Sequence, residues 1–310
     1  MRKSRSLFIS LLIVAIMMAT AVTVMAQDRD DAPTVVGSSV PEKGPSLPLT
    51  PLGIDALLYD NGSLINSAGT GVGGADESVL QTTSLGLNTL GFGHQALNGN
   101  RVADDFTVFH AGGWDVSTIT FYAYQTGSTT TSTMTGANLR IWDGVPAAVG
   151  SNVIWGDTST NVMTSTTWSN IYRVTETTTG SNVDRPIMMV VIEVNQQLPA
   201  GTYWLDWQVD GSLGSGPWAP PVTINGQAST GNGLQSLDDG ATFAAALDTG
   251  TGTPQQGFPF LIEGQLTAPT DVSFSSFSGD AAGSSLPLVV GLVVLTILAG
   301  AIVLRRQVAH

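Results

Sequence analysis

Residues 118–124 read Thr-Ile-Thr-Phe-Tyr-Ala-Tyr, a run in which apolar and polar side chains alternate. Successive side chains of a β-strand point to opposite faces, so we expect Ile119, Phe121 and Ala123 to face a core together. No stretch of residues 54–264 keeps a 3.6-residue apolar period over several turns. The segment is therefore predicted to be all-β, a jelly-roll-like antiparallel β-sandwich. Six further strand-like runs, separated by turns rich in Gly, Pro, Asn and Asp, lie at residues 101–109, 137–143, 170–175, 187–194, 201–209 and 258–264.

Two of these runs are expected to lie side by side. Residues 187–194 are apolar on both faces, which is typical of a central, covered strand. The Pro-Ala-Gly sequence at residues 199–201 supplies a turn after it. We therefore expect residues 187–194 and 201–209 to be antiparallel neighbours. The inward row of the second strand would be Tyr203, Leu205, Trp207 and Val209.

The N-terminal segment has the layout of a secretory signal peptide. Three basic residues precede an apolar run at residues 7–24, and Val24-Met25-Ala26 offers a small-residue cleavage site. Residues 1–26 are therefore interpreted as a signal peptide, with an uncleaved anchor helix as the alternative. Residues 27–53 contain five prolines and few apolar clusters, which predicts an extended linker.

The C-terminal segment is interpreted as a membrane anchor. Residues 286–304 carry no charge and are followed at once by Arg305 and Arg306. A helix of that length spans about 28 Å, close to the hydrocarbon thickness of a bilayer. Arginines flank the cytoplasmic side, so the body is predicted to lie outside the membrane. Residues 265–285 would be a polar linker and residues 305–310 a cytoplasmic tail; a cleaved sorting signal is the alternative.

The charge of the chain excludes one class of partner. Between Gln27 and Ser285, 6 basic residues accompany 24 acidic ones, a net charge of −18. Such a field repels phosphate backbones, so no nucleic acid is expected as a partner. The chain has no cysteine, which removes disulfides and thiolate chemistry together.

Catalytic motifs are absent from the sequence. It contains no G-x-S-x-G elbow, H-E-x-x-H helix, P-loop or dinucleotide fingerprint, and His94 and His110 are the imidazoles of the body. We expect His94 to be an exposed loop residue. The 24 acidic residues leave open an exported carboxylate-dependent hydrolase as an alternative function.

Calcium is the one cofactor that the sequence suggests. Hard cations take carboxylate oxygens, and an exported domain without disulfides gains from a metal clip. Asp104 and Asp105 stand in tandem and are the candidate ligands, although none of the acidic clusters has EF-hand spacing. The competing interpretation is that these carboxylates cap turns or are solvated.

Aromatic residues indicate a possible ligand surface. Sugar rings stack on indole faces while neighbouring amides and carboxylates bind the hydroxyls. Trp204, Asp206 and Gln208 share one face of a predicted strand, and Arg140 and Trp142 form a similar outward row. Trp218, in a Pro-rich segment, is a further candidate. The competing interpretation is that these tryptophans close a sandwich core.

Four segments carry a resemblance to a known family. Residues 101–108 read Arg-Val-Ala-Asp-Asp-Phe-Thr-Val, residues 139–144 read Leu-Arg-Ile-Trp-Asp-Gly, and residues 198–204 read Leu-Pro-Ala-Gly-Thr-Tyr-Trp. With Gly112-Gly113-Trp114, this succession resembles bacterial exported β-sandwich domains of the choice-of-anchor type over about residues 101–264. The resemblance implies surface display and brings no catalytic residues. The tail lacks a Pro-Glu-Pro box and an LPxTG motif, which favours a plain membrane helix.

The sequence therefore predicts a cell-surface module, held by one membrane helix, for adhesion, glycan binding or structural display. A binding module should present an exposed aromatic platform, whereas the alternative hydrolase should present a cleft with two carboxyls of raised pKa.

Overall fold

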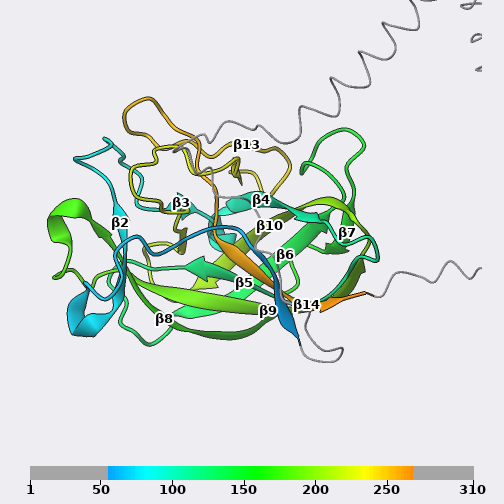
Figure 1. Ribbon diagram of the computed structural model, residues 1–310, viewed down its shortest axis with the longest axis horizontal. Coiled ribbons are helices and arrows are strands. Elements are labelled where there is room, and N and C mark those ends of the chain that lie inside the picture. The colour runs from blue at the N-terminus through cyan, green and yellow to red at the C-terminus, as the bar shows by residue number, and fades with distance from the viewer. Residues whose placement is uncertain (1–54, 268–310) are drawn as a thin grey trace, which may run out of the picture.

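The computed structural model describes residues 55–267, which form an all-β body of three sheets (Figure 1). The first six-stranded sheet has the order β1-β14-β5-β9-β8-β2, and the second has the order β13-β12-β4-β10-β6-β7. A small third sheet pairs β11 (Trp218–Ala219) with β3 (Phe92–Gly93). The strands of the first sheet are β1 (Ala56–Asp60), β14 (Phe260–Leu266), β5 (Trp114–Ala123), β9 (Pro186–Leu198), β8 (Met163–Thr175) and β2 (Asp76–Leu80). Those of the second are β13 (Ala244–Ala245), β12 (Leu234–Ser236), β4 (Arg101–Val108), β10 (Gly201–Gly211), β6 (Met134–Trp142) and β7 (Val153–Gly156).

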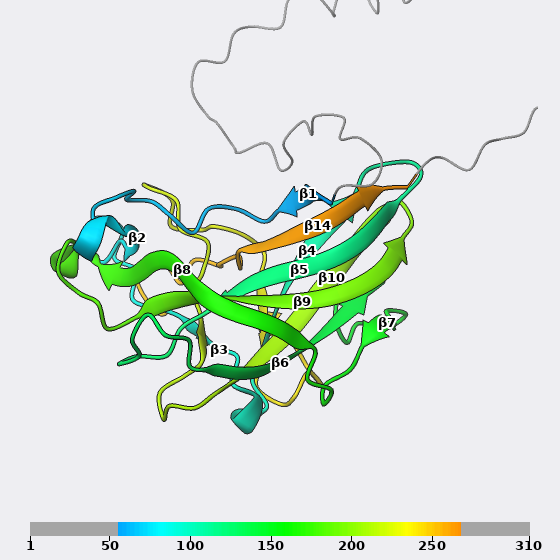
Figure 2. The same ribbon diagram turned by 90° about the horizontal axis from the view of Figure 1, so that it is seen from below.

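The two large sheets pack face to face around one apolar core. Phe121 of β5 and Trp207 of β10 have ring centroids 5.4 Å apart, and Tyr59 of β1 lies 6.0 Å from Phe106 of β4. The first sheet curls around this core (Figure 2). Burial of each such side chain contributes roughly 1.5–3 kcal/mol, so the alternating pattern of the strands is the main source of the fold's stability.

All seven predicted strand regions are strands in the structure, with bounds that differ by up to four residues except at β8, which begins seven residues earlier than predicted. The predicted inward row of β10 is confirmed, because Tyr203, Leu205, Trp207 and Val209 are all buried in the core. The short strands β1, β2, β3, β7, β11, β12 and β13 were not predicted. Their exposed or brief runs carry too few alternations to stand out from loop sequence.

Two predictions about strand pairing are wrong. β9 and β10 are not neighbours: β9 lies between β5 and β8, whereas β10 lies between β4 and β6. The turn at residues 199–200 therefore crosses from one sheet to the other, so two inward rows face each other across the core. The body is also not purely antiparallel, because β2 pairs with β8 in parallel.

Both ends of the described chain lie at the same end of the body. Ala56 pairs with Gly264, and the backbone N–H of Thr267 donates to the carbonyl of Gly113 at 3.1 Å. We call this the near end; it also holds the turn at residues 109–113, the loop at residues 143–152 and the turn at residues 199–200. β2 lies at the opposite, far end (Figures 1 and 2).

The predicted signal peptide, Pro-rich linker, membrane helix and cytoplasmic tail lie outside the described residues, as does most of the polar linker. Within residues 55–267, no helix is long and apolar enough to span a bilayer.

Candidate functional site

The predicted aromatic and polar row lies on the outer face of the second sheet. Trp204, Asp206 and Gln208 alternate with the core row of β10, so all three point away from the core. Trp142 and Arg140 of β6 pair directly with Trp204 and Asp206. Cross-strand partners share a face, so the structure brings these five predicted residues together.

Asp206 is the centre of this group. Its carboxylate accepts hydrogen bonds from Arg101 Nε, from Trp142 Nε1 and, at 2.9 Å, from Arg140 Nε. Arg101 also donates to Asn138 Oδ1 at 2.6 Å. Burial lowers the pKa of Arg101, and the charge of Asp206 opposes that shift. We call Arg101, Asn138, Arg140, Trp142, Trp204, Asp206 and Gln208 the Asp206 network.

A loop covers the Asp206 network. Trp142 and Trp204 cluster with Leu234 and Phe243, and each indole residue is only 7% exposed. Asp239 closes the other side, where its Oδ1 accepts from Gln208 Nε2 at 3.2 Å. Gly240 has a φ of +82°, and a Cβ there would collide with Arg140 Nη2, so only glycine allows this close cover.

The expected open aromatic platform is therefore not what the structure shows. The sequence placed the tryptophans correctly on an outward face, but Leu234 of the neighbouring strand β12 and the loop at residues 237–243 turn that face into a second, covered layer. The Arg140 guanidinium lies 4.8 Å from the centre of the Trp142 ring, in a cation–π contact. A ligand that stacks on either indole must first displace the loop.

Two polar atoms of the network have no hydrogen-bond partner within the described protein. They are Nη2 of Arg140, a donor, and Oε1 of Gln208, an acceptor. Buried polar atoms are nearly always paired with protein or with ordered water. Because Gly240 packs directly against Arg140 Nη2, the evident role of the network is to fix the loop to the sheet.

Trp218 lies apart from the Asp206 network. It belongs to β11, its backbone pairs with Tyr124, and its Nε1 donates to Ser215 Oγ at 3.3 Å. The side chain is half-buried against a small cluster that contains Leu64 and Tyr124. The six predicted ligand-binding residues therefore divide into one group of five and one separate residue.

The two candidate calcium ligands do not converge. Asp104 lies on the core face of β4, where its Oδ2 accepts from the Phe258 N–H at 2.7 Å, whereas Asp105 is on the outer face. Over residues 55–267, no three His, Cys, Asp or Glu side chains are placed together to hold a metal ion. The carboxylate of Asp104 ties the approach to β14 onto β4.

His94 is not the exposed loop residue that the sequence suggested. It is completely buried beside β3, and both ring nitrogens lack a partner within the described protein. Burial lowers the pKa of His94 to about 3, so the imidazole is neutral at physiological pH. It is therefore a structural residue of the core.

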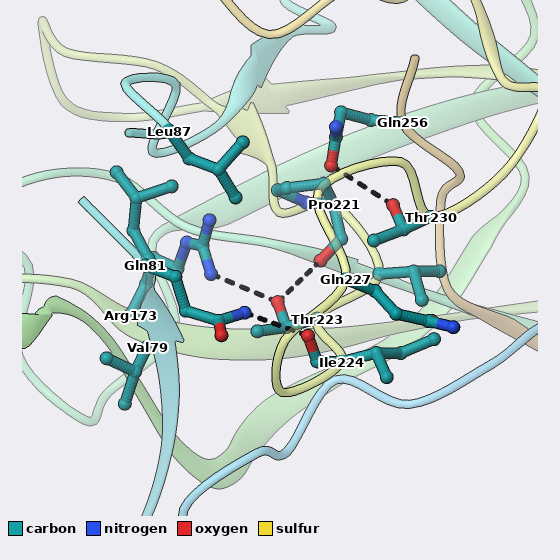
Figure 3. Close-up of a pocket in the computed structure, with 12 residues that line it drawn as sticks. Val79, Gln81, Leu87, Arg173, Pro221, Thr223, Ile224, Gln227, Thr230 and Gln256 are labelled. Atoms are coloured by element: carbon teal, nitrogen blue, oxygen red, sulfur yellow. Dashed lines mark hydrogen bonds between the residues drawn. The ribbon is translucent and has the colours of Figure 1, made fainter. Parts of the chain in front are cut away.

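A second polar site, at the far end, was not anticipated from the sequence (Figure 3). A small hollow of about 10 Å³, close to the room that one water molecule needs, is lined by Arg173 together with Gln81, Thr223, Thr230 and Gln256. Arg173 Nη1 donates to Ser78 Oγ at 3.0 Å and to Thr223 Oγ1 at 3.1 Å. Burial lowers the pKa of Arg173 to about 10, so it remains charged at neutral pH. The signal that could have revealed it is an arginine inside the strand run Ile-Tyr-Arg-Val-Thr.

No protein-family model, no curated protein and no solved structure matches this chain.

Proposed function

We propose that the chain is an exported, single-pass membrane protein that displays a jelly-roll-like β-sandwich at the cell surface. The observation that carries this proposal is the pairing of Ala56 with Gly264, which places both ends of the described chain at the near end. A body attached through one end presents its opposite end to the surroundings. That arrangement suits the display role implied by the resemblance to choice-of-anchor domains.

Adhesion, glycan binding and structural display are the roles that such a module would serve. The far end offers the Arg173 hollow, with amide and hydroxyl groups around one cation. The Asp206 network offers stacked indole and guanidinium groups once its loop is displaced. The Arg173 hollow is small and the Asp206 network is covered, so a ligand at either place would require the protein to rearrange. Structural display requires no such rearrangement and is the role we favour.

The alternative, an exported carboxylate-dependent hydrolase stabilised by calcium, receives less support. The lining of the Arg173 hollow contains no carboxylate. The buried carboxylates of Asp104, Asp206 and Asp248 accept hydrogen bonds from backbone N–H groups or from arginine and tryptophan side chains. Burial raises the pKa of Asp60, but the hollow does not include it.

The orientation can be tested with single cysteines because the chain has none of its own. Leu97 is 92% exposed, so Leu97→Cys should react with a membrane-impermeant maleimide on intact cells that express the full chain. Gln307→Cys, in the predicted cytoplasmic tail, is the matched control and should react only after permeabilisation. Labelling of Gln307→Cys but not Leu97→Cys on intact cells would refute surface display.

A further inference from the structure

Two apolar loop tips project from the near end of the body. Phe109 follows β4 and is 57% exposed, and Val149, in the loop at residues 143–152, is fully exposed. Val145, in the same loop, is also exposed. Residues 144–156 carry no charge, although the body as a whole is strongly acidic. Other exposed apolar side chains, among them Leu97 and Leu237, are scattered over the body, whereas these three stand on two loops at the end where the described chain begins and ends.

The first tip lies where the chain leaves the body. The Phe109 ring packs edge-on against Trp114, with centroids 5.5 Å apart. Trp114 pairs with Leu266, the last residue of β14. The next residue, Thr267, donates to the Gly113 carbonyl, so the turn at residues 109–113 is in direct contact with the start of the C-terminal linker.

The second tip is held in a defined shape at the same end. The Asp143 carboxylate accepts from the backbone N–H of Asn152 at 2.6 Å and from its side chain at 3.1 Å. The Ala148 N–H donates to the Val145 carbonyl at 3.1 Å. These bonds close the loop, so Val145 and Val149 are presented outward by a stiff turn rather than by a free strand end.

The length of the remaining chain determines what this end can reach. The 18 residues from Ala268 to Ser285 separate the body from the apolar segment at residues 286–304. Such a linker spans at most roughly 60 Å when fully extended, and a relaxed chain is much shorter. A membrane helix would therefore hold the near end beside the bilayer, where even weak partitioning is strengthened by a high local concentration.

We propose that the near end docks on the surface of the lipid bilayer, with Phe109, Val145 and Val149 inserted among the headgroups. This inference rests on the proposed membrane anchoring. Aromatic and aliphatic side chains partition into the interfacial region. Asp143 closes the loop that carries Val145 and Val149, and Asp115 follows Trp114, against which Phe109 packs. Both residues are acidic, so the surface fits zwitterionic lipids and is repelled by anionic ones.

The test uses the full chain reconstituted in phosphatidylcholine vesicles that contain a lipid with a nitroxide quencher on its headgroup. A fluorophore is attached to Ala111→Cys or to Val149→Cys at the near end, and to Leu97→Cys as the matched exposed control away from it. Interfacial side chains lie within the headgroup layer, so quenching at positions 111 and 149 should exceed quenching at position 97 at least about threefold. Replacing Phe109 and Val145 by serine in the Val149→Cys background should lower that quenching by about half.

The outcomes separate anchoring from docking. Flotation of the protein with the vesicles together with selective quenching at positions 111 and 149 would support both. Flotation with equal quenching at positions 97 and 149 would overturn docking and leave anchoring intact. Failure to float would overturn both. Fluorescence changes at position 149 that do not depend on the nitroxide lipid would indicate contact between two copies of the chain and would also overturn docking.

Discussion

Arg101 and Arg173 are both fully buried arginines in β-strands, but the two sites accommodate the charge in different ways. Arg101, on β4, shares the Asp206 carboxylate with Arg140 under the loop at residues 237–243. Arg173, on β8, donates to neutral oxygens, among them the Leu90 carbonyl at 2.8 Å and the hydroxyls of Ser78 and Thr223. One site balances charge with charge in direct contact, and the other surrounds a cation with dipoles, beyond which the charge of Asp248 acts at longer range.

This difference predicts how each site fails. A buried ion pair is strongly destabilised when one partner is removed, because the remaining charge is left uncompensated. Removal of Arg173 leaves the buried carboxylate of Asp248, which attracts the guanidinium without an ion pair between them. That carboxylate keeps its own donors, the backbone N–H groups of Asn88, Thr89 and Gly250, so the main loss is of hydrogen bonds and packing. Stability should therefore depend more on Asp206 than on Arg173.

The largest effect is expected at Asp206. Asp206→Asn keeps the shape of the side chain but leaves the guanidinium groups of Arg101 and Arg140 without their shared carboxylate, which should lower the free energy of unfolding by about 4 kcal/mol. Asp210→Asn, an exposed change on the same face of β10, should cost less than about 0.5 kcal/mol. Urea denaturation measures both. Equal effects of the two substitutions would show that the Asp206 network is not an ion-pair centre.

A smaller loss is expected at Arg173. Arg173→Met fills similar volume but removes the donors to Ser78, Thr223 and Leu90, so the free energy of unfolding should fall by about 2 kcal/mol. Arg185→Met, at a half-buried arginine that precedes β9, is the control, and its free energy of unfolding should fall by about 0.5 kcal/mol or less. If Arg173→Met proves as costly as Asp206→Asn, the distinction between the two sites fails.

His94 extends the comparison, since it is buried in the neutral state. Its folded pKa of about 3 lies below the usual value of 6.5, so the unfolded chain binds a proton between these values and the folded chain does not. The free energy of unfolding should therefore fall by about 1.4 kcal/mol for each unit by which pH decreases across that range, in addition to the effect of other groups. His94→Leu should remove this contribution, whereas His110→Leu should keep it. Denaturation at pH 4 and pH 6 measures the difference, and identical pH slopes in the two variants would contradict the assignment.

The smallest effect is expected at Asp239, the exposed partner of the Asp206 network. Its Oδ1 lies 3.7 Å from Arg101 Nη1, and its side chain is about half exposed. Asp239→Asn should therefore cost less than about 1 kcal/mol, because water screens an exposed ion pair. The rate of proteolytic cleavage within residues 237–243 should rise by a larger factor than the rate of global unfolding. A loss as large as that of Asp206→Asn would mean that the loop, rather than the pair with Arg101, dominates the site.

The sequence predicted the strands well and the pairing of strands poorly. Alternation along residues 118–124 and 201–209 is a local property, and it identified both the strands and the inward row that ends at Val209. The sheet to which a strand belongs depends on the direction of a turn. The turn at residues 199–200 reads equally well as a hairpin or as a crossing between sheets, so the neighbour predicted for β9 was wrong.

The candidate site shows the same division. The pattern correctly placed Arg140, Trp142, Trp204, Asp206 and Gln208 on one face. It could not show that this face is covered, because the covering residues Leu234 and Phe243 lie far along the chain. Arg101 and Asn138 were missed as members of the network, although their positions on β4 and β6 indicate the same face. The strand run that contains Arg173 gives no sign of the loop at residues 221–230 that completes its site.

The most direct test of the proposed display function is the intact mass of the protein extracted from membranes, measured with protease shaving of whole cells. We expect a mass that corresponds to residues 27–310, and loss of the body to protease while the apolar segment at residues 286–304 stays with the membrane. A mass that ends before residue 286, or a body that protease cannot reach on intact cells, would contradict a module displayed on one membrane helix.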